Sequence, residues 1–576
     1  MNQKLYKFLN MISVLCVSAL SAQELAPAVD ESELSLPSEP INLGAAEDEV
    51  VLVEALLQLD VVPVESIRPI EGDHQGLVRR DLPNALNGKD FEMWAECFLG
   101  YPISRESLKR LESGTRNMMT LAGKPYSLVY LPEQDITEGR VRLVVQESRI
   151  GDIRIEGNQY FSEESYLNKF GFLEGETIDR NALVPRIAQI NRSDYRAATV
   201  KVVRGSEPGT SDIVIVTREQ KPWKVFTGIN NTGTQSTEEM RLTAGLNYGN
   251  LWGLDHQVSL QWSSDPGADH SRSLWGSYTV PIGLKGDFTV FGSQSWTNAK
   301  VNPPLSQEGE SYQLGLNFDY ELDPVGQRYQ HSWQLGFDFK ASDNNLDYAI
   351  PPFVVAISDN LTHVVQGRLQ YRGTFIDDWG YTRGTITAVY SPGNLSDHNT
   401  NEDFSGTRAF AEADYVYGKV SLFRDTRLGG AFEGWNWTLQ ADLQIASGNL
   451  MGSEQFSAGG SATVRGYEEG EAIGDHGFLL SQELQLPAVE TKVNLLGRSY
   501  PGQLRCFIFQ DYAETWNQDK LTGEEPFDLM SVGLGLNYQM GRYLSAQVTH
   551  GVQLRDSGSS DTGDNSRTHF SLTLSY

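Results

Sequence analysis

The sequence has few cysteines and none of the short motifs that mark the common catalytic and metal sites. Its 576 residues include three cysteines, and Cys97 and Cys506 lie too far apart in the chain to indicate a disulfide framework. No Cys-x-x-Cys, His-Glu-x-x-His, Gly-x-Ser-x-Gly or glycine-rich phosphate loop is present. The nine histidines are scattered without metal-ligand spacing. We therefore expect no enzyme, with no catalytic residue, no metal, no cofactor and no nucleotide.

Positive charge and long apolar runs are also scarce. The chain has 46 lysines and arginines against 75 aspartates and glutamates, a formal net charge of -29, which argues against a nucleic-acid partner. Beyond residue 22 no apolar run approaches the roughly 20 residues that a membrane-spanning helix needs. A soluble enzyme is the simplest interpretation of these numbers. However, ten of the eleven tryptophans lie at or beyond Trp223, and strands that face lipid only at alternate positions look hydrophilic on average.

The first 48 residues are predicted to be a targeting segment followed by a leader. Two lysines precede a mostly apolar run over residues 8–20, and small residues follow this run. This is the pattern of a secretory signal peptide over residues 1–22, and its apolar run is too short to cross a bilayer as a helix. Residues 23–48 are acidic, contain three prolines and lack helical periodicity, which predicts a flexible leader.

Residues 49–148 and 149–220 are predicted to form two small α+β modules. In the first, Ser104 can cap a helix whose apolar positions follow helical spacing. Strands are expected there over residues 126–131 and 140–146. In the second module we expect strands and helices in the order 150–156, 163–170, 181–190, 199–203 and 212–217. The pattern favours strand–helix–helix–strand–strand in both modules, each of which is small for a domain.

Residues 221–576 show the period-two alternation of β-strands, with turn residues between successive runs. The last strand alternates apolar with polar residues and ends on an aromatic residue, with Phe570, Leu572, Leu574 and Tyr576 on one face. A soluble β-sandwich also alternates, but the aromatic residues at strand ends favour lipid as the apolar partner. Lipid leaves no hydrogen-bonding partner for an open sheet edge, so the sheet must close. About 355 residues at roughly 22 per strand and loop predict an antiparallel barrel of about sixteen strands.

Several segments resemble the two-partner secretion transporters, which are the haemolysin and filamentous-haemagglutinin secretion-activation exporters within the superfamily of outer-membrane barrel-assembly factors. The resemblance covers essentially the whole mature chain. In chain order, the segments that carry it are Pro208–Ile213, Ile229–Thr237, Gly459-Gly460, Val464–Tyr467, Gly474-Asp475 and Phe509–Asp511. It implies that the two modules are POTRA domains in the periplasm. It also implies that the barrel spans the outer membrane in contact with lipid, and that Val464–Tyr467 lie on a loop folded into the pore.

The alternation gives Arg465 an expected partner. If Cys506 and Ile508 face lipid, then Phe509 and Asp511 face the lumen, because successive strand residues point to opposite faces. A guanidinium on a re-entrant loop could then make a forked, charge-assisted contact with Asp511 that lysine would match poorly. Taken alone, the tetrad would favour an external loop with a solvated arginine. The inward position of Asp511 favours the contact in the lumen.

The other candidate residues have structural roles in this interpretation. Val464 precedes Arg465 in the tetrad, Gly466 would let the loop tip turn tightly, and Tyr467 could pack in the lumen with its hydroxyl bonded. Ser, His and Asp are plentiful, so composition alone leaves open a hydrolase built from lumen or rim residues. Glu483 and Asp442 also lie on inward faces, and we interpret them as pore-lining residues rather than a catalytic pair.

The resemblance implies a transporter that exports one dedicated large exoprotein, of adhesin or cytolysin type, from the periplasm to the cell surface. POTRA domains would bind this substrate in unfolded form, for example by strand addition to an exposed sheet edge. Two alternatives stay open, a barrel-assembly factor that inserts other outer-membrane proteins and a passive porin-like channel. Two modules are few for an assembly factor, and a porin would leave the modules unexplained. Some family members plug the pore with an N-terminal helix, but the three prolines of residues 23–48 argue against one here.

Overall fold

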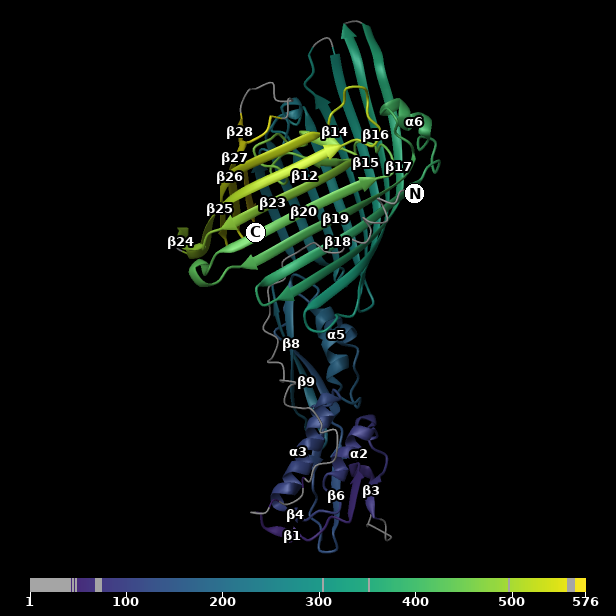
Figure 1. The fold of residues 1–576 in the computed structure, drawn as a ribbon, viewed down its shortest axis with the longest axis vertical. Coiled ribbons are helices and arrows are strands. Elements are labelled where there is room, and N and C mark those ends of the chain that lie inside the picture. The colour runs from purple at the N-terminus through teal and green to yellow at the C-terminus, as the bar shows by residue number, and fades with distance from the viewer. Residues whose placement is uncertain are drawn as a thin grey trace. The chain divides into compact units, whose positions relative to one another are not determined.

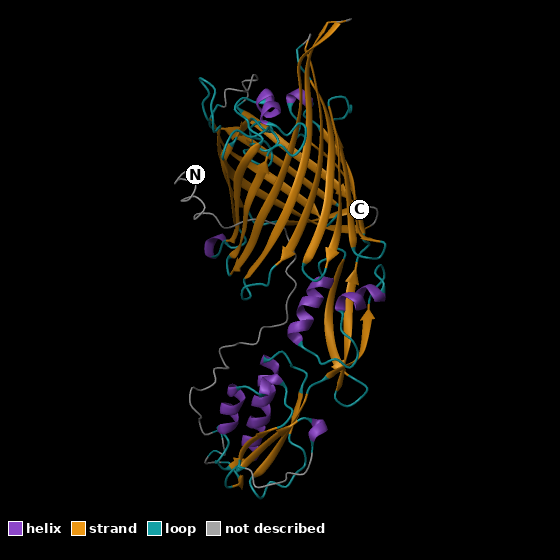
Figure 2. Cartoon of the chain, turned by 90° about the vertical axis from the view of Figure 1, so that its right-hand side faces the viewer, coloured by secondary structure: helices purple, strands orange, loops and turns teal. Residues whose placement is uncertain are grey.

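The computed structural model describes residues 43, 46, 49–67, 75–302, 305–350, 353–495, 498–556 and 565–576 (Figures 1 and 2). The predicted signal peptide lies outside the described residues, as does the predicted leader apart from Leu43 and Ala46. The described part of the chain divides into two compact units, one that ends at Lys221 and one of Pro222–Tyr576. Among the described residues, no helix combines the length and the apolar character needed to cross a membrane.

The first part of the smaller unit is a four-stranded sheet packed against two helices. The sheet has the order β3-β2-β6-β5, in which β2 runs parallel to both β3 and β6. Ser104 caps α3 as predicted, because its hydroxyl accepts a hydrogen bond from the Ser107 amide at 2.9 Å. The elements are β1 (Val51–Val53), β2 (Gln58–Val62), β3 (Gly76–Arg79), α2 (Lys89–Glu96), β4 (Ile103–Ser104), α3 (Arg105–Leu121), β5 (Leu128–Tyr130) and β6 (Arg140–Gln146). The strand–helix–helix–strand–strand plan is wrong here, because β3 precedes both helices and pairs with β2.

The second part of the smaller unit follows the predicted order of elements. Its three-stranded sheet has the order β7-β9-β8, so β8 forms one edge. Ser162 and Asp179 cap the two helices, each accepting a hydrogen bond from a first-turn amide. The helices pack on the sheet through a core that includes Tyr166, Phe170 and Ile213, all fully buried. The elements are β7 (Arg149–Glu156), α4 (Glu163–Phe170), α5 (Arg180–Ile190), β8 (Arg196–Arg204) and β9 (Thr210–Glu219).

The larger unit is a closed antiparallel barrel, which confirms the predicted fold class. The described strands occupy sixteen positions around the ring, here called staves. β23 and β24 both pair with β25 and together make up one interrupted stave. The first eight are β10 (Trp223–Asn230), β11 (Arg241–Leu251), β12 (His256–Ser264), β13 (Ser271–Ile282), β14 (Gly286–Ala299), β15 (Leu305–Glu321), β16 (Tyr329–Ile350) and β17 (Phe353–Asp377). The rest are β18 (Gly380–Pro392), β19 (Asp414–Arg427), β20 (Asn436–Ala446), β23 (His476–Gln485), β24 (Val489–Leu495), β25 (Arg498–Trp516), β26 (Phe527–Met540), β27 (Leu544–Gln553) and β28 (Ser566–Ser575).

The barrel closes between its first and last strands. β10 pairs with β28 from Phe226 opposite Ser575 to Asn230 opposite Ser571. The amide of Tyr576 donates to the carbonyl of Val225 at 2.9 Å, which extends the ladder to the last residue. This closure leaves no open sheet edge in lipid, as the bilayer requires.

The faces of the barrel strands follow the predicted alternation. On the last strand, Leu572, Leu574 and Tyr576 are exposed on the outside, whereas His569 is 3% exposed and points inward. Three neighbouring staves, β15, β16 and β17, contain 17, 22 and 25 residues, well above the roughly 9–11 residues that cross a bilayer as a tilted strand. These strands project past the rest of the ring (Figures 1 and 2).

A buried ion pair joins the two central strands of the first module. Asp60 on β2 lies opposite Arg142 on β6, and the Arg142 Nη2 and Nε atoms donate to Asp60 Oδ2 at 2.8 and 3.0 Å. The Asp60 side chain has no exposed surface. Arg80 Nε lies 3.8 Å from Asp60 Oδ1, beyond hydrogen-bond distance, so Arg142 is the cation that holds this carboxylate. Removal of Arg142 would leave the buried charge largely uncompensated.

We predict that Arg142→Met destabilises the first module by about 3–5 kcal/mol, the usual result of breaking one side of a buried pair. Hydrogen exchange measured by mass spectrometry on the full chain should show faster exchange in β2 and β6. Asp60→Leu added to Arg142→Met should restore much of the protection, because the pair is then replaced as a unit. Arg79→Met is the control, since Arg79 pairs with Glu92 near the surface. Unchanged exchange in Arg142→Met would contradict the prediction.

Candidate functional site

The loop between β20 and β23, residues 447–475, folds back along the inner wall of the barrel. Two short strands, β21 (Phe456–Ala458) and β22 (Ala472–Gly474), pair with each other and form its stem. Val464 and Tyr467 at its tip are fully buried against the wall residues Leu479, Ala513 and Leu529. These wall residues alternate with positions that face outward, so the tetrad Val464–Tyr467 lies in the lumen.

Arg465 is held by a carboxylate of the wall strand β25. Its Nη2 and Nε atoms donate to the two oxygens of Asp511, at 2.7 Å to Oδ1 and 2.8 Å to Oδ2, and its backbone amide donates to Oδ2 at 3.0 Å. The Asp511 side chain has no exposed surface, and the Arg465 side chain is 6% exposed. The structure thus places Arg465 and Asp511 in the forked contact that the alternation of β25 predicts.

Aromatic rings and a second carboxylate complete the surroundings of the guanidinium. The Arg465 guanidinium carbon lies 3.7 Å from the centre of the Phe509 ring, within range of a cation–π contact. Nη1 donates to Glu483 on β23, and Nη2 lies 3.3 Å from the Ser481 hydroxyl, which itself donates to Asp511 at 2.6 Å. One cation therefore shares two carboxylates, and the cluster as a whole carries negative charge.

Gly466 lets the loop approach the wall more closely than any other residue could. Its φ of 102° lies in a region that L side chains rarely adopt, and a Cβ built there would lie 2.9 Å from the carbonyl atoms of Gly551 on β27. The Gly466 amide donates to His569 Nε2 at 3.3 Å, and its carbonyl accepts from the Gln553 side-chain amide at 2.7 Å. The tip is thus bonded through its backbone to β27 and β28.

Tyr467 is fixed at both ends. Its ring is fully buried in the cluster with Val464. Its hydroxyl donates to the carbonyl of Arg555 at 2.6 Å and accepts from the amide of Met530 at 3.2 Å. The Tyr467 ring thus packs in the lumen and its hydroxyl is hydrogen-bonded, as the sequence predicts.

Two wall residues at the site, Glu483 and His569, were not assigned to the loop contact from sequence. The alternation predicts Glu483 to be a pore-lining residue, and it lies in the lumen, bonded to Arg465. The register could have suggested its role, because Glu483 lies opposite Phe509 on the adjacent strand. The alternation of the last strand places His569 on the inner face, but no sequence pattern predicts its contact with Gly466.

The start of the loop is anchored on a different sector of the wall. Glu454 is 2% exposed. It accepts hydrogen bonds from Lys340 at 2.5 Å, Gln366 at 2.8 Å and Tyr417 at 2.8 Å, on β16, β17 and β19. The loop therefore reaches from these strands to β25, β27 and β28.

The lumen shows hydrogen-bonded ion pairs rather than a set of metal ligands. In the part of the chain that the structure describes, no group of three or more His, Cys, Asp or Glu residues is arranged to hold a metal ion. Chemically, the site can hold a loop against the wall through ion pairs that are shielded from water. The loop can be released when water or another partner replaces these ion pairs.

A closed barrel that follows two α+β modules and contains such a loop defines a class of outer-membrane proteins, the barrels that carry POTRA modules. The family model described as "Haemolysin secretion/activation protein ShlB/FhaC/HecB" matches residues 209–538, and a model described as "POTRA: Surface antigen variable number repeat" matches residues 148–220. The first match covers more than half of the chain. The chain therefore belongs to the haemolysin secretion/activation family.

Individual relatives agree with this assignment. The chain is 22% identical over 456 residues to the outer membrane transporter CdiB-2 of Burkholderia pseudomallei, covering 77% of this chain and 72% of the relative. It is 22% identical over 492 residues to the heme/hemopexin transporter protein HuxB of Haemophilus influenzae strain 86-028NP, covering 83% and 81%. The chain is thus an outer-membrane transporter of the two-partner secretion family, with its POTRA modules in the periplasm.

Solved structures show the same fold. CdiB from Escherichia coli superposes with a TM-score of 0.69 at 16% identity, covering 100% of this chain and 96% of that one. BamA from Haemophilus ducreyi lacking POTRA domains 1–3 superposes with a TM-score of 0.52 at 15% identity, covering 86% and 98%. At these identities the likeness establishes the fold alone.

We predict that Gly466→Ala releases the loop tip, because the new methyl group would collide with the backbone of Gly551, which cannot rotate away. The added strain at positive φ is on the order of 1–3 kcal/mol. Trypsin should then cut the folded chain after residue 465, a bond that the native contacts shield. Gly452→Ala is the control, because it lies in the same loop with no atom within 4 Å of its Cβ position. Equal resistance of Gly466→Ala and the parent chain would count against this account of the tip.

Proposed function

We propose that this chain exports one dedicated large exoprotein, of adhesin or cytolysin type, from the periplasm to the cell surface. Family membership supports this direction of transport. The names of two kinds of relative, the hemolysin transporter protein HpmB of Proteus mirabilis and the heme/hemopexin transporter protein HuxB, support a protein cargo of this type. The proposed division of labour is capture by modules at residues 49–148 and 149–220, and passage through the barrel at residues 221–576.

An edge strand in the second module, β8, supports capture of an unfolded substrate along the part beyond Ala198, whose backbone is bonded by the Asn191 side chain. β8 pairs with β9 along nine residues, from Arg196 opposite Glu219 to Arg204 opposite Ser211. Among the described residues no strand pairs with its other side. Main-chain hydrogen bonds along such an edge can bind an extended polypeptide with little demand on its sequence.

The observation that carries the proposal is the cluster of Arg465, Asp511 and Glu483. It fixes a loop inside the lumen that a passing polypeptide would have to displace. The pairs are shielded but polar, so each group can be solvated again once the loop moves. A passive channel gains nothing from a loop held by buried charges, whereas an exporter needs a closure that yields to its substrate.

The sequence contains no nucleotide-binding motif, so the free energy for export is proposed to come from the substrate itself. A chain that folds outside the cell cannot slide back, and folding on the outer side then favours net movement outward. A paired proteomic comparison, with and without this gene, tests the whole proposal. Loss of one large protein from the culture supernatant with an unchanged outer membrane is the expected result. Broad loss of other barrels would favour the assembly-factor alternative, and loss of neither would favour a passive channel.

We predict that Arg465→Ala lowers export of that protein by at least about tenfold, since loss of one partner from a shielded pair costs several kcal/mol at the loop. The amount of barrel in the outer membrane should stay the same, because the strand ladder does not involve this side chain. Quantification of the exoprotein in the supernatant and of the barrel in the membrane checks both statements. Arg328→Ala is the matched control, because Arg328 pairs with Asp378 in solvent, where an ion pair contributes little. Normal export in Arg465→Ala would remove the loop from the mechanism.

A further inference from the structure

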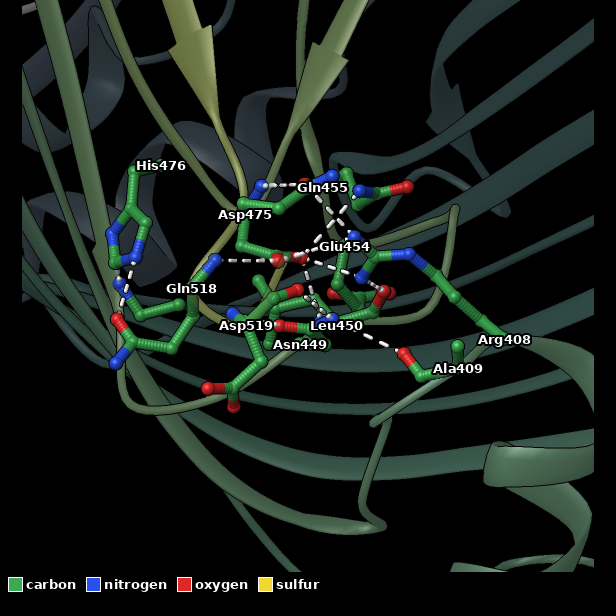
Figure 3. A network of polar contacts seen from close by, with 12 residues as sticks. Arg408, Ala409, Asn449, Leu450, Glu454, Gln455, Asp475, His476, Gln518 and Asp519 are labelled. Carbon is green, nitrogen blue, oxygen red and sulfur yellow. Dashed lines mark hydrogen bonds and ion pairs between the residues drawn. The ribbon is translucent and has the colours of Figure 1, made fainter. Parts of the chain in front are cut away.

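A second buried ion pair holds the other end of the same loop. Asp475, the last loop residue before β23, has a side chain with no exposed surface. Arg408 binds it in a fork, with Nη1 2.6 Å from Oδ1 and Nη2 3.1 Å from Oδ2 (Figure 3). No sequence pattern predicts this pair, because two barrel strands, β19 and β20, and most of the re-entrant loop separate the two residues.

Asp475 also joins several loops through the backbone. Its Oδ1 accepts from the amide of Leu450 at 2.8 Å, and its Oδ2 accepts from the amide of Gln518 at 3.2 Å (Figure 3). Its own carbonyl accepts from the Gln444 side chain at 3.0 Å. Leu450 lies near the start of the re-entrant loop, and Gln518 lies in the loop after β25. A single carboxylate therefore links the two ends of the re-entrant loop to each other and to a neighbouring loop.

Arg408 lies in a third loop, between β18 and β19. It follows the short helix α6 (Asn401–Thr407) and donates also to the Leu450 carbonyl at 2.5 Å and to Asn517 Oδ1 at 2.9 Å. The fully buried Phe404 of α6 packs in a cluster with Leu450 and Met451. The loop that carries α6 is thus joined to the base of the re-entrant loop by charge and by packing.

Asn449 adds a reciprocal bond within the same network. Its side chain donates to the Asp519 carbonyl at 3.0 Å and accepts from the Asp519 amide at 2.8 Å. It donates as well to the Ala409 carbonyl at 3.1 Å (Figure 3). All three loops are therefore connected twice, once through Asp475 and once through Asn449.

These loops lie at the extracellular end of the barrel. The chain enters β10 directly after the periplasmic modules, so β10 runs outward. In an antiparallel barrel, the loops after β18, β20 and β25 then lie at the outer end, because successive staves alternate in direction. A polypeptide that leaves the lumen must pass between the loops that this network joins.

The kind of contact at this end suits a closure that opens. The outer end of the loop packs in a small apolar cluster around Phe404 and Leu450, and beside that cluster it is held by hydrogen bonds and one ion pair. When such a pair separates into water, both ions recover their hydration, and the net change in free energy is small compared with the strength of the contact itself.

We propose that the Arg408–Asp475 ion pair is a latch that keeps the outer end of the re-entrant loop joined to its neighbours and must open for the lumen to conduct. The role in export rests on the proposed function, whereas the opening itself can be tested without any substrate. Arg408 is a positioning residue in this mechanism. It acts through the loop that carries Arg465.

A reversible crosslink tests the latch. Arg408→Cys and Asp475→Cys are combined in a full-length chain that also carries Cys97→Ser and Cys506→Ser, and the two thiols are bridged by oxidation or by a short thiol-exchange crosslinker. Potassium chloride conductance is then recorded in planar bilayers. We expect opening events to disappear after bridging and to return after reduction. The matched control bridges Ser457→Cys to Ile473→Cys, register partners within the loop stem, and should leave the events unchanged.

Equal opening with and without the bridge would overturn the proposal. Should the doubly substituted chain fail to fold, Arg408→Ala gives a second test, because loss of the latch should raise the frequency of opening above that of the parent chain. Arg408→Lys, which keeps the positive charge beside Asp475, should stay nearer the parent frequency than Arg408→Ala, and no rise in Arg408→Ala would again overturn the proposal. In cells, absence of export from the unmodified chain would count against the proposed function, while the bilayer recordings would still decide the latch.

Discussion

Lipid offers no hydrogen-bond partner to a peptide group, and the whole of the larger unit follows from that constraint. The sheet has to close, so β10 and β28 pair and the ladder continues to Tyr576. Closure fixes which side chains face inward, because residues paired across adjacent strands point to the same face of the sheet. Inward parity in turn gives the lumen its polar character and brings Asp511, Glu483 and His569 within reach of one loop.

The lumen loop is held by charges at three separated points. Glu454 binds β16, β17 and β19, Arg465 binds β23 and β25, and Asp475 binds the neighbouring outer loops. Apolar packing stabilises the tip, but the anchors on either side are polar. A loop attached in this way can be held firmly at rest, and each of its ion pairs can be exchanged for water or for other polar partners.

Much of this arrangement could be predicted from the sequence, and the reason is periodicity. Alternation along β25 assigned Asp511 to the lumen, and the helical and strand patterns of the second module gave its elements in their observed order. The first module was harder, because the four-residue β3 is too short to show a period. Arg408 and Asp475 could not be paired from sequence, since loops have no period and their meeting depends on the curvature of the closed ring.

The long neighbouring staves β15, β16 and β17 have a consequence for how the family can vary. Their outer portions lie beyond the bilayer and are held by pairing within the hairpin rather than by lipid. Residues can be inserted or deleted there in pairs without changing the number of staves, the seam between first and last strands or the parity of the lumen. The outer ends of these staves are therefore the part of the barrel whose length can change most freely without altering the pore.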